Sequence, residues 1–322
     1  MMKNLPAGFK IGHWTDHQAV TGCTVVLCPS RCVGGCDVRG GSPGSRELAL
    51  LQSEKTMQEV HAVLLTGGSA YGLAAADGVM RFLEEHDIGY HTPWINVPIV
   101  PTGVIFDLNI GSRTVRPTAE SGYLACEAAS DIGIEQGTVG VGTGATLGKW
   151  AALGARMMGG FGIASVTYGD VVVSAAAVVN AVGDVVEDNG QILAGARGEN
   201  GKWLATKGGV RAFSRSKPNA ATNTTLVVVM TNAKLSKVDV NRMAQRGHNG
   251  LARAIRPVHT SYDGDIVFGL ASGTVDANVD VVAEMGAEVT AAAIRSGVRH
   301  ASSAGGVLSY RDIAGGTKNH RP

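Results

Sequence analysis

Short runs of β-branched, apolar residues alternate along this chain with alanine-rich stretches of helical period, which restricts it to folds that mix sheet and helix. Apolar residues follow Ser236 and Asp276 at helical spacing, and both residue types cap helix N-termini. Helices are predicted to begin near Ser69, Ala119, Ser236 and Asp276. Strands are predicted at residues 24–27, 62–65, 99–106, 163–166, 171–173, 175–179, 226–230 and 266–271. The predicted fold class is α/β.

The chain has 322 residues, enough for a deep hydrophobic core, and its charge narrows the classes of partner. Lys plus Arg number 28 and Asp plus Glu number 27, so the net charge of +1 gives no general attraction to nucleic acid or a membrane surface. Only 17% of residues are charged, so much surface must be hidden between layers or in a subunit interface. The 45 glycines lack a three-residue period, which excludes collagen and favours tight turns.

The first residues and the cysteines predict a cytoplasmic protein. No apolar run near the start is long enough for a signal peptide, and none approaches the ~20 residues of a membrane span. Five cysteines, an odd number, favour reduced thiols. Cys23, Cys28, Cys32 and Cys36 cluster without the Cys-x-x-Cys spacing of a zinc site, so we expect buried or half-buried thiols and no metal.

Two glycine-rich segments match known motifs by letter but lack the required chemistry. Residues 40–44 fit the serine nucleophile elbow, yet Pro43 has no backbone N–H to offer an oxyanion hole. Residues 140–150 fail as a phosphate loop, because Thr143 replaces a required glycine and Trp150 replaces the Mg²⁺-binding hydroxyl. The dinucleotide fingerprint survives there only in a weak form, with no good strand before it. We expect turns in both segments.

The bond between Asn223 and Thr224 has features of a self-cleavage site. A glycine-rich, basic stretch at residues 198–220 ends shortly before it, and a predicted strand follows at once. If this bond were cut, Thr224 would carry its hydroxyl and a free α-amine on one strand end. An α-amine has a pKa of about 7.7–8.0, so it can take the hydroxyl proton without a histidine. Threonine at a strand start is also commonplace, so spacing alone leaves both interpretations open.

A set of motifs spread from about residue 8 to about residue 306 is specific when taken together. They are GFKIGHWTD, TGCTVVL, CDVRGGSPGSRE, LLTGGSAYGLAAADGV, VPIVPTGVIFDL, GTVGVGTGATLGKW, NTTLVVVMTNAKLSK and HNGLARAIRPVHTSYDGDIVFGLASG. With these motifs the chain resembles the DmpA-type aminopeptidase family, whose relatives include β-aminopeptidases and nylon-oligomer hydrolases. Threonine at position 224 is similar to the nylon hydrolases, whereas the best-known members carry serine.

The resemblance implies a four-layer αββα sandwich of the DmpA/ornithine-acetyltransferase-like type. It also implies one precursor that cuts itself between Asn223 and Thr224. The two products would be residues 1–223 and 224–322, which stay together as one domain.

The same resemblance assigns roles to individual residues. Thr224 is implied as the nucleophile and Asn180 as a donor to the oxyanion of the tetrahedral intermediate. Lys149 is implied beside the nucleophile, where a cation would keep the α-amine neutral; the alternative is a solvated surface lysine. Asp263 and Asp265 are implied behind the nucleophile, although Asp-Gly-Asp alone is ordinary turn chemistry.

Phe106 departs from the family pattern, because several relatives have tyrosine there. Phenylalanine cannot donate a hydrogen bond to an oxyanion. Either a backbone N–H from residues 142–146, around Gly144, substitutes for the hydroxyl, or Phe106 shapes an apolar substrate pocket. Tyr71 is a further candidate for lining the site, with packing as its first interpretation.

The implied function is an N-terminal-nucleophile amidohydrolase that needs no metal or organic cofactor. Its substrates would be short peptides, amino-acid amides or ω-amide oligomers with a free amine, which acidic residues near the pocket would select. The resemblance further implies a homo-oligomer, a tetramer, with no nucleic-acid or membrane partner. Two alternatives remain: an acyltransferase of related fold, and a catalytically silent oligomeric homologue.

Overall fold

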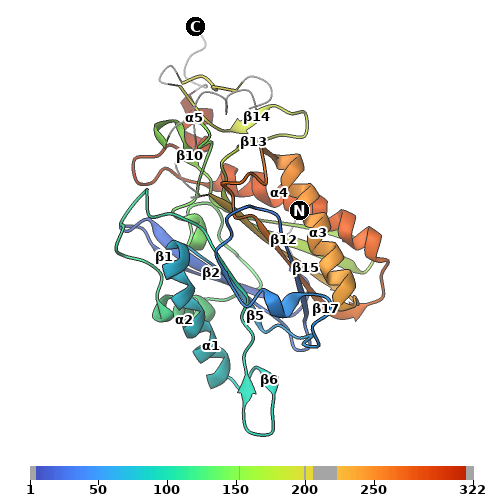
Figure 1. Ribbon diagram of the computed structural model, residues 1–322. Helices are drawn as coiled ribbons and strands as arrows, with labels where there is room; N and C mark the ends of the chain where they lie inside the picture. Colours follow the sequence, from blue (N-terminus) through green and yellow to red (C-terminus); the bar gives the residue numbers. More distant parts are fainter. Residues whose placement is uncertain (1–4, 152, 199–200, 206–222, 317–322) are drawn as a thin grey trace.

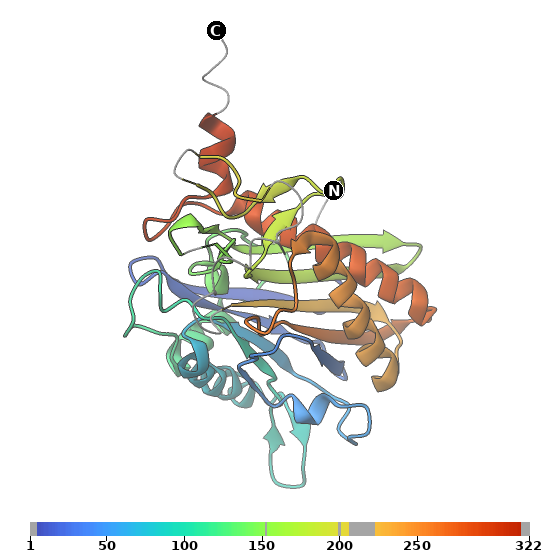
Figure 2. The ribbon, with the colours of Figure 1, turned by 45° about the horizontal axis from the view of Figure 1, so that its top comes forward.

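The computed structural model describes residues 5–151, 153–198, 201–205 and 223–316 (Figure 1). Two five-stranded sheets lie face to face, and helices cover the outer face of each, so that the layers run helix, sheet, sheet, helix (Figures 1 and 2). The α/β class predicted from the sequence is confirmed, and the layers match the sandwich that the resemblance implies.

The first sheet comes from the first half of the chain. Its order is β1 (Lys10–Asp16), β2 (Thr21–Leu27), β5 (Ala62–Thr66), β8 (Thr102–Val104) and β4 (Ser45–Arg46). Helices α1 (Ala75–Glu85) and α2 (Ala119–Glu127) cover its outer face. Val25 and Leu64 of the sheet form one apolar cluster with Val79, Leu83 and Ala125 of these helices.

The second sheet combines strands that lie far apart in the sequence. Its order is β11 (Phe161–Tyr168), β12 (Val171–Asn180), β15 (Thr224–Ala233), β17 (Ile266–Val275) and β3 (Val33–Val38). Helices α3 (Lys237–Ala254) and α4 (Val279–His300) pack side by side on its outer face (Figure 1). Strands β15 and β17 are therefore flanked by β12 and β3, both from earlier in the chain.

The middle of strand β15, residues 226–230, is buried on both faces, which explains its unbroken apolar sequence. Leu226, Val228 and Met230 pack into the core between the sheets. Val227 and Val229 pack into the core beneath α3 and α4. Because successive side chains of a strand point to opposite faces, a central strand between two cores must be apolar throughout.

The remaining elements are short. A small sheet contains β14 (Ile192–Ala194), β13 (Asp184–Val186) and β16 (Ile255–Arg256), and β9 (Thr146–Leu147) pairs with β10 (Met157–Met158). The 3₁₀ helices are η1 (Ala49–Leu51), η2 (Ser69–Ala74), η3 (Gly140–Gly142) and η4 (Leu153–Ala155), and α5 spans Tyr310–Gly316. The cysteines are buried or half-buried free thiols, as predicted. Within the described ranges, no helix is long and apolar enough to cross a bilayer.

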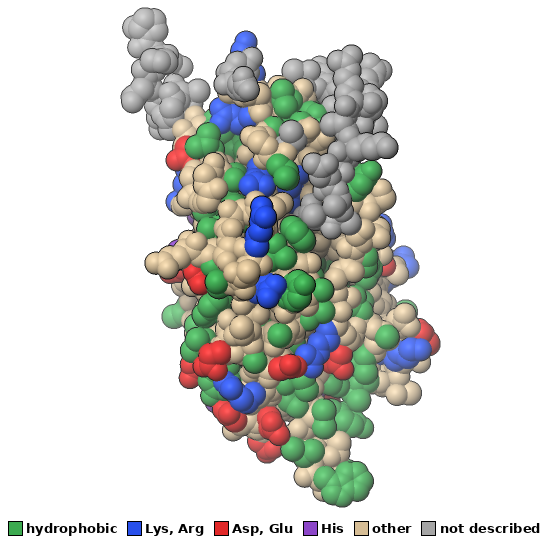
Figure 3. Space-filling model, turned by 60° about the vertical axis from the view of Figure 1, so that its left-hand side comes forward, with side chains coloured by type: hydrophobic (Ala, Val, Ile, Leu, Met, Phe, Trp, Pro, Cys, Tyr) green, Lys and Arg blue, Asp and Glu red, His purple; other side chains and the backbone are tan. Residues whose placement is uncertain are grey.

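The hairpin of β6 (Tyr90–His91) and β7 (Asn96–Val97) projects from the body of the molecule (Figures 1 and 2). Hydrophobic side chains gather at this projecting end, at the bottom of Figure 3. Trp94 in the hairpin loop is 89% exposed.

Three predicted strands differ from the structure. Residues 171–173 and 175–179 form one continuous strand, β12. Ser174 between them is buried, and its hydroxyl lies 2.9 Å from the hydroxyl of its neighbour Ser165 on β11. The strand predicted at residues 99–106 shortens to Thr102–Val104. Pro98 directly precedes this segment and Pro101 lies within it, and proline cannot donate to a sheet ladder.

Two predicted helix starts also need correction, while Ser236 caps α3 as predicted. The helix near Ser69 opens as the 3₁₀ turn η2, since Ser69 has a φ of 54°, and α1 begins only at Ala75. Asp276 is not the cap of α4. Asn278 is, with its Oδ1 accepting the N–H of Asp280 at 2.8 Å.

Candidate active site

Thr224 is the first residue of β15, and neighbouring strand ends place other predicted site residues around it. Asn180 ends β12 directly opposite Thr224 in the antiparallel register. On the other side, Asn223 forms a parallel bridge with Asp263, just ahead of β17. All four residues are buried. The structure therefore brings residues 180, 224 and 263 together at one end of the second sheet.

Lys149 is buried against the end of β12, with only 5% of its surface exposed. Its Nζ donates to Asn180 O at 3.0 Å and to Asn180 Oδ1 at 2.7 Å. The preceding Gly148 has a φ of 70°, and a Cβ there would lie 2.4 Å from the backbone N of Ala196. Only glycine fits this close turn, which aims Lys149 inward. The alternative of a solvated surface lysine is wrong.

Burial sets the charge of this lysine. It lowers the pKa of Lys149 to about 7, with the nearby Asp263 charge opposing the change and the Arg156 charge adding to it. An amine with this pKa is present in both its charged and neutral forms near neutral pH. The steady cation expected from the resemblance is therefore only one of its two forms.

The side-chain amide of Asn180 is oriented by its neighbours. Its Oδ1 accepts one hydrogen bond from the ammonium of Lys149 and another from the backbone N–H of Thr146 at 3.1 Å. Two donors on one oxygen fix the orientation of the amide. Nδ2 then turns towards the loop after β8, where it donates to Phe106 O at 3.3 Å. Phe106 is half-buried and is brought beside Asn180 through its backbone.

The turn at residues 142–146 lies against the same loop. A Cβ at Gly144 would lie 2.5 Å from the Cβ of Asp107 and 2.5 Å from Val20 O, so this position has room only for glycine. The N–H of Thr146 is used in orienting Asn180. The expected substrate contact at Gly144 stays a prediction.

Asp263 and Asp265 hold backbone segments around Thr224. Asp263 Oδ1 accepts Val182 N–H at 3.1 Å, and its Oδ2 accepts the N–H and hydroxyl of Thr260 at 3.1 and 2.5 Å. Burial raises the pKa of Asp263 to about 6, with the Asp265 charge contributing. Asp265 Oδ1 accepts Thr225 N–H at 2.7 Å. Both carboxylates thus bind backbone segments close to Thr224. The roles that the resemblance implies for them stay predictions.

Two residues at this site were missed by sequence reasoning. His259 Nδ1 lies 2.8 Å from Asp265 Oδ2, and its ring stands edge-on to that of His248 with centroids 4.7 Å apart. Gly264 donates its N–H to Asn223 O at 2.8 Å. The available signal was the glycine between two aspartates, which is also common in plain turns.

The segment at residues 40–44 also lies beside the site, although not as a nucleophile elbow. The N–H of Ser42 donates to Asp263 O at 2.9 Å, and that of Gly40 donates to Asp265 O at 3.3 Å. As predicted, the segment contains bends rather than strand or helix. It supports the Asp-Gly-Asp loop from the side opposite β15.

Tyr71 lies at the surface in η2, with 65% of its area exposed. The guanidinium of Arg116 lies 4.1 Å from the centroid of its ring. This places Tyr71 in a surface cation–π pair rather than in the hydrophobic core. Its role in lining the site stays a prediction.

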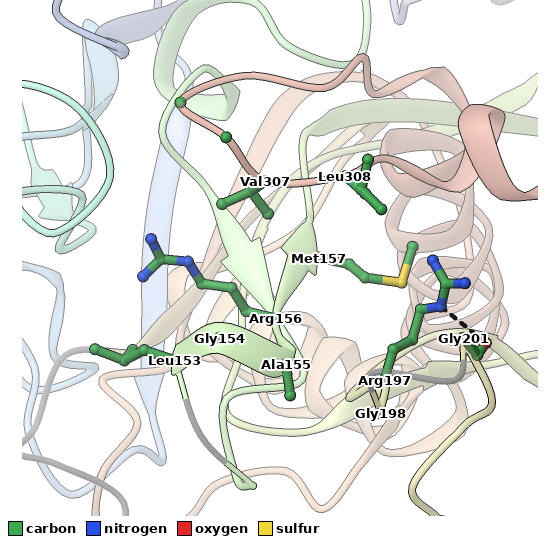
Figure 4. A pocket seen from close by; sticks show the side chains of 12 residues that line it. Leu153, Gly154, Ala155, Arg156, Met157, Arg197, Gly198, Gly201, Val307 and Leu308 are labelled. Atoms are coloured by element: carbon green, nitrogen blue, oxygen red, sulfur yellow. Dashed lines mark hydrogen bonds between the residues drawn. The ribbon is translucent and has the colours of Figure 1, made fainter.

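A cavity of about 620 Å³ opens beside η4 and β10 (Figure 4). Arg156 and Arg197 flank it, with Met157, Val307 and Leu308 between them (Figure 4). Arg156 also donates to Asn109 O at 3.1 Å, three residues beyond Phe106. Among the described residues that line this cavity, the charged ones are Arg156 and Arg197. The expectation of acidic side chains near the substrate pocket stays a prediction.

The part of the chain that the structure describes holds no group of three or more His, Cys, Asp or Glu side chains arranged for a metal ion. Of the basic stretch predicted at residues 198–220, residues 199–200 and 206–220 lie outside the described residues.

Comparison with known proteins identifies relatives over nearly the whole chain. A family model described as Peptidase family S58 matches residues 7–310. An uncharacterised aminopeptidase of Mycobacterium leprae is 42% identical, with 94% of this chain and 91% of that protein covered. A 6-aminohexanoate-oligomer endohydrolase of Kocuria sp. is 31% identical over 84% of this chain and 74% of its own length.

A solved structure with a similar fold is that of the L-aminopeptidase D-Ala-esterase/amidase of Ochrobactrum anthropi, described as a variant of the Ntn hydrolase fold. Its TM-score is 0.70 at 15% identity, with 93% of this chain and 86% of that chain covered. At this identity the likeness concerns the fold alone.

Proposed function

The chain belongs to peptidase family S58, the DmpA-type family that its motifs resemble, and from this we propose that it is a self-cleaving amidohydrolase with Thr224 as nucleophile. Family membership supports a hydrolase of peptide or amide bonds. The proposed additions are the nucleophile, the cut before it and the roles of the surrounding residues.

One observation carries the proposal. The hydroxyl of Thr224 donates to the carbonyl oxygen of Asn223 at 2.5 Å, so the nucleophile already touches the peptide bond to be cut. Asn180 lies opposite Thr224. The amine of Lys149, with a pKa of about 7, donates a hydrogen bond to the side chain of Asn180. A hydroxyl, a base and an amide donor are the groups that acyl transfer needs.

The cut would proceed by an N-to-O acyl shift. Thr224 Oγ attacks the carbonyl carbon of Asn223 while its proton passes to the neutral amine of Lys149. The C–N bond then breaks, the leaving nitrogen takes a proton and becomes the α-amine of Thr224, and an ester remains on Oγ. Water hydrolyses this ester, which leaves a carboxylate on Asn223 and restores the hydroxyl. The products are residues 1–223 and 224–322.

The cut enzyme would use the same hydroxyl on external amides. The new α-amine takes the proton of Oγ, the oxygen attacks the substrate carbonyl, and Asn180 Nδ2 donates to the oxyanion. The protonated α-amine gives its proton to the leaving amine, and water releases the acyl group. Asp265 holds the backbone of Thr225 next to the nucleophile, and Asp263 holds the backbone of Val182 and Thr260 nearby. These steps require no metal or organic cofactor.

The proposed substrates are short peptides, amino-acid amides and ω-amide oligomers. The relatives named aminopeptidase are 42% identical, and those named 6-aminohexanoate-oligomer endohydrolase are 31% identical, so both kinds of amide belong in the test. We further propose that the protein acts in the cytoplasm as a homotetramer.

The first test is the state of the chain. Purified protein should run as two chains on a denaturing gel, with Thr224 at one N-terminus, and Thr224→Ala should stay a single chain. Thr290→Val is a matched control, because the buried Thr290 hydroxyl has no partner among the described residues, and this variant should still cut. Two chains in Thr224→Ala would mean that another protease cuts, which would contradict the proposal.

The second test concerns the reaction. Hydrolysis of an aminoacyl anilide, with and without an added amine, separates the three candidates. A hydrolase releases the free acid in both cases, an acyltransferase needs the amine and forms its amide, and a silent homologue releases nothing.

A further inference from the structure

The carbonyl oxygen of Asn223 accepts two hydrogen bonds in the uncut chain. Thr224 Oγ1 donates to it at 2.5 Å, and the backbone N–H of Gly264 donates to it at 2.8 Å. When Thr224 Oγ loses its proton and attacks, its own hydrogen bond is lost. The N–H of Gly264 remains on the oxygen that gains negative charge.

This donor is held rigidly in place. Asn223 and Asp263 form a parallel bridge, to which the Gly264 bond belongs. The carboxylates on both sides of Gly264 are fixed in turn, since Asp263 accepts Val182 N–H and Asp265 accepts Thr225 N–H. A donor that needs no reorganisation as charge develops is the kind that stabilises a tetrahedral intermediate.

Space explains why this position is glycine. A Cβ on Gly264 would lie 2.8 Å from Thr224 Oγ1 and 2.6 Å from Ser42 O. Both distances are too short for carbon against oxygen, so any side chain would press on the nucleophile or on residues 40–44. Glycine lets the backbone N–H approach the reacting bond while Thr224 Oγ stays free to move.

We propose that Gly264 is a catalytic residue of self-cleavage, whose backbone N–H serves as the oxyanion donor for the Asn223 carbonyl. The inference rests on the proposed function, because it assigns a role within the proposed cut. In this step the C–Oγ bond forms, the carbonyl π electrons move onto Asn223 O, and Gly264 N–H stabilises them. The electrons return as the C–N bond breaks and the nitrogen is protonated.

The test removes this donor and adds no side chain. Cell-free translation can place glycolic acid at position 264, which exchanges the backbone N–H for an oxygen atom. The newly made, radiolabelled chain is then followed on denaturing gels as it cuts. We expect cleavage to slow by ~10²–10³-fold, the usual effect of losing one oxyanion donor.

Gly137 provides the matched control. It is a buried glycine in an isolated bridge, and its N–H donates to Phe161 O at 2.7 Å. Glycolic acid at position 137 removes a comparable hydrogen bond away from Thr224, so that chain should cut at the natural rate. Equal rates for the two substituted chains would overturn the inference. If the natural chain itself is not cut, the proposed function fails, and the role of Gly264 fails with it.

A second measurement decides the matter if the chain with glycolic acid at position 264 is protease-sensitive and so misfolded. A ¹³C label on the Asn223 carbonyl in Thr224→Ala reports its hydrogen bonding by infrared absorption, with the hydroxyl donor already gone. A frequency typical of a hydrogen-bonded carbonyl supports Gly264 as the remaining donor. A frequency typical of a free carbonyl overturns it.

Discussion

Lys149 is a buried amine that changes charge close to neutral pH, and the groups around it explain why. Removal from water lowers its pKa to about 7, although the Asp263 charge favours the protonated form. The uncut chain has no α-amine at Thr224, so the proposed base for the cut is Lys149 itself. Asp263, with its pKa raised to about 6, is the acidic neighbour that titrates nearby.

Self-cleavage should therefore speed up as pH rises from about 6 to about 8, with a midpoint near the Lys149 pKa of about 7. Lys149→Arg stays charged throughout this range and should cut ~10²-fold more slowly or worse. The measurement is the first-order rate of cutting of newly made chain at each pH. Lys234→Arg, at an exposed lysine, should keep the natural profile. A natural rate that does not change with pH would remove Lys149 from the proton transfer.

The lowered pKa of Lys149 also predicts how the free energy of unfolding changes with pH. A lysine in a salt bridge loses stabilising energy as pH rises, whereas this buried lysine should make the protein more stable. The Lys149 pKa is about 7 in the folded protein against 10.5 in the unfolded chain, so between these values the unfolded chain binds the extra proton. Stability therefore rises with pH in this window, by up to about 1.4 kcal/mol per pH unit.

Lys149→Met should remove this contribution, so its free energy of unfolding should rise less steeply between about pH 7.5 and 9.5. Urea unfolding in the uncut Thr224→Ala background measures the slope. An unchanged slope would mean that the Lys149 pKa is not lowered in the folded chain.

Phe106 tests whether the departure from the family is a loss or an adaptation. Phe106→Tyr should raise KM or lower the free energy of unfolding by ~1–3 kcal/mol, because the new hydroxyl needs a partner in an apolar neighbourhood. Its carbonyl contact with Asn180 comes from the backbone and should persist. Steady-state kinetics decide between the two interpretations. A gain of up to ~10²-fold in kcat with KM unchanged would show an incomplete oxyanion hole instead.

At the scale of elements, the start of α4 provides a sharp test. Asn278→Ala should lower the free energy of unfolding by ~1 kcal/mol, because it removes the acceptor for Asp280 N–H. Asp276→Ala should change it by less than ~0.5 kcal/mol, since its side chain is 94% exposed and reaches Lys234 only at 4.0 Å. Urea unfolding of uncut Thr224→Ala protein compares them. A larger effect at Asp276 would return the cap to that residue.

The local sequence pattern predicts the helices and strands whose polar and apolar residues match their burial in the fold. The apolar run of β15 and the capped, periodic α3 are found where expected, because burial on both faces and the helical stripe leave direct traces. Strand β3 was not predicted, because it contains two glycines and an aspartate. As an edge strand it needs neither a continuous apolar run nor strict alternation of apolar and polar residues.

The residues of the candidate site also fall into those that the local sequence indicates and those that it does not. Thr224 at a strand start leaves a local trace, whereas Lys149 and Asn180 were named through family resemblance. Gly264 and His259 depend on contacts that form only when the sheet assembles. Gly264 meets Asn223 through a parallel bridge between segments about forty residues apart, which no local pattern encodes.

The whole molecule has its proposed cut in the middle of a sheet rather than at a boundary. Residues 224–322 contribute β15 and β17, and residues 1–223 contribute the strands on both sides, β12 and β3. Both cores of the second sheet also combine side chains from the two segments. Neither piece can complete the second sheet without the other, so the pieces are expected to stay together after the cut.

Refolding should show this interdependence. Denatured Thr224→Ala should regain its sheet at a rate independent of protein concentration, because its two segments remain tethered. Denatured cut protein should refold more slowly on dilution, because two separate chains must first meet. Circular dichroism at several concentrations measures both rates. Cut protein that refolds independently of dilution would mean that the strands do not need one another.

Strands β15 and β17 lie between two strands of the other segment, and this arrangement also determines how the folded structure is lost over time. In the proposed cut form, the peptide bond between Asn223 and Thr224 no longer tethers the two segments, so an unfolded molecule cannot refold as a single chain. Loss of structure then becomes practically irreversible at low concentration, so the working life of the enzyme depends on how fast it opens rather than on its free energy of unfolding.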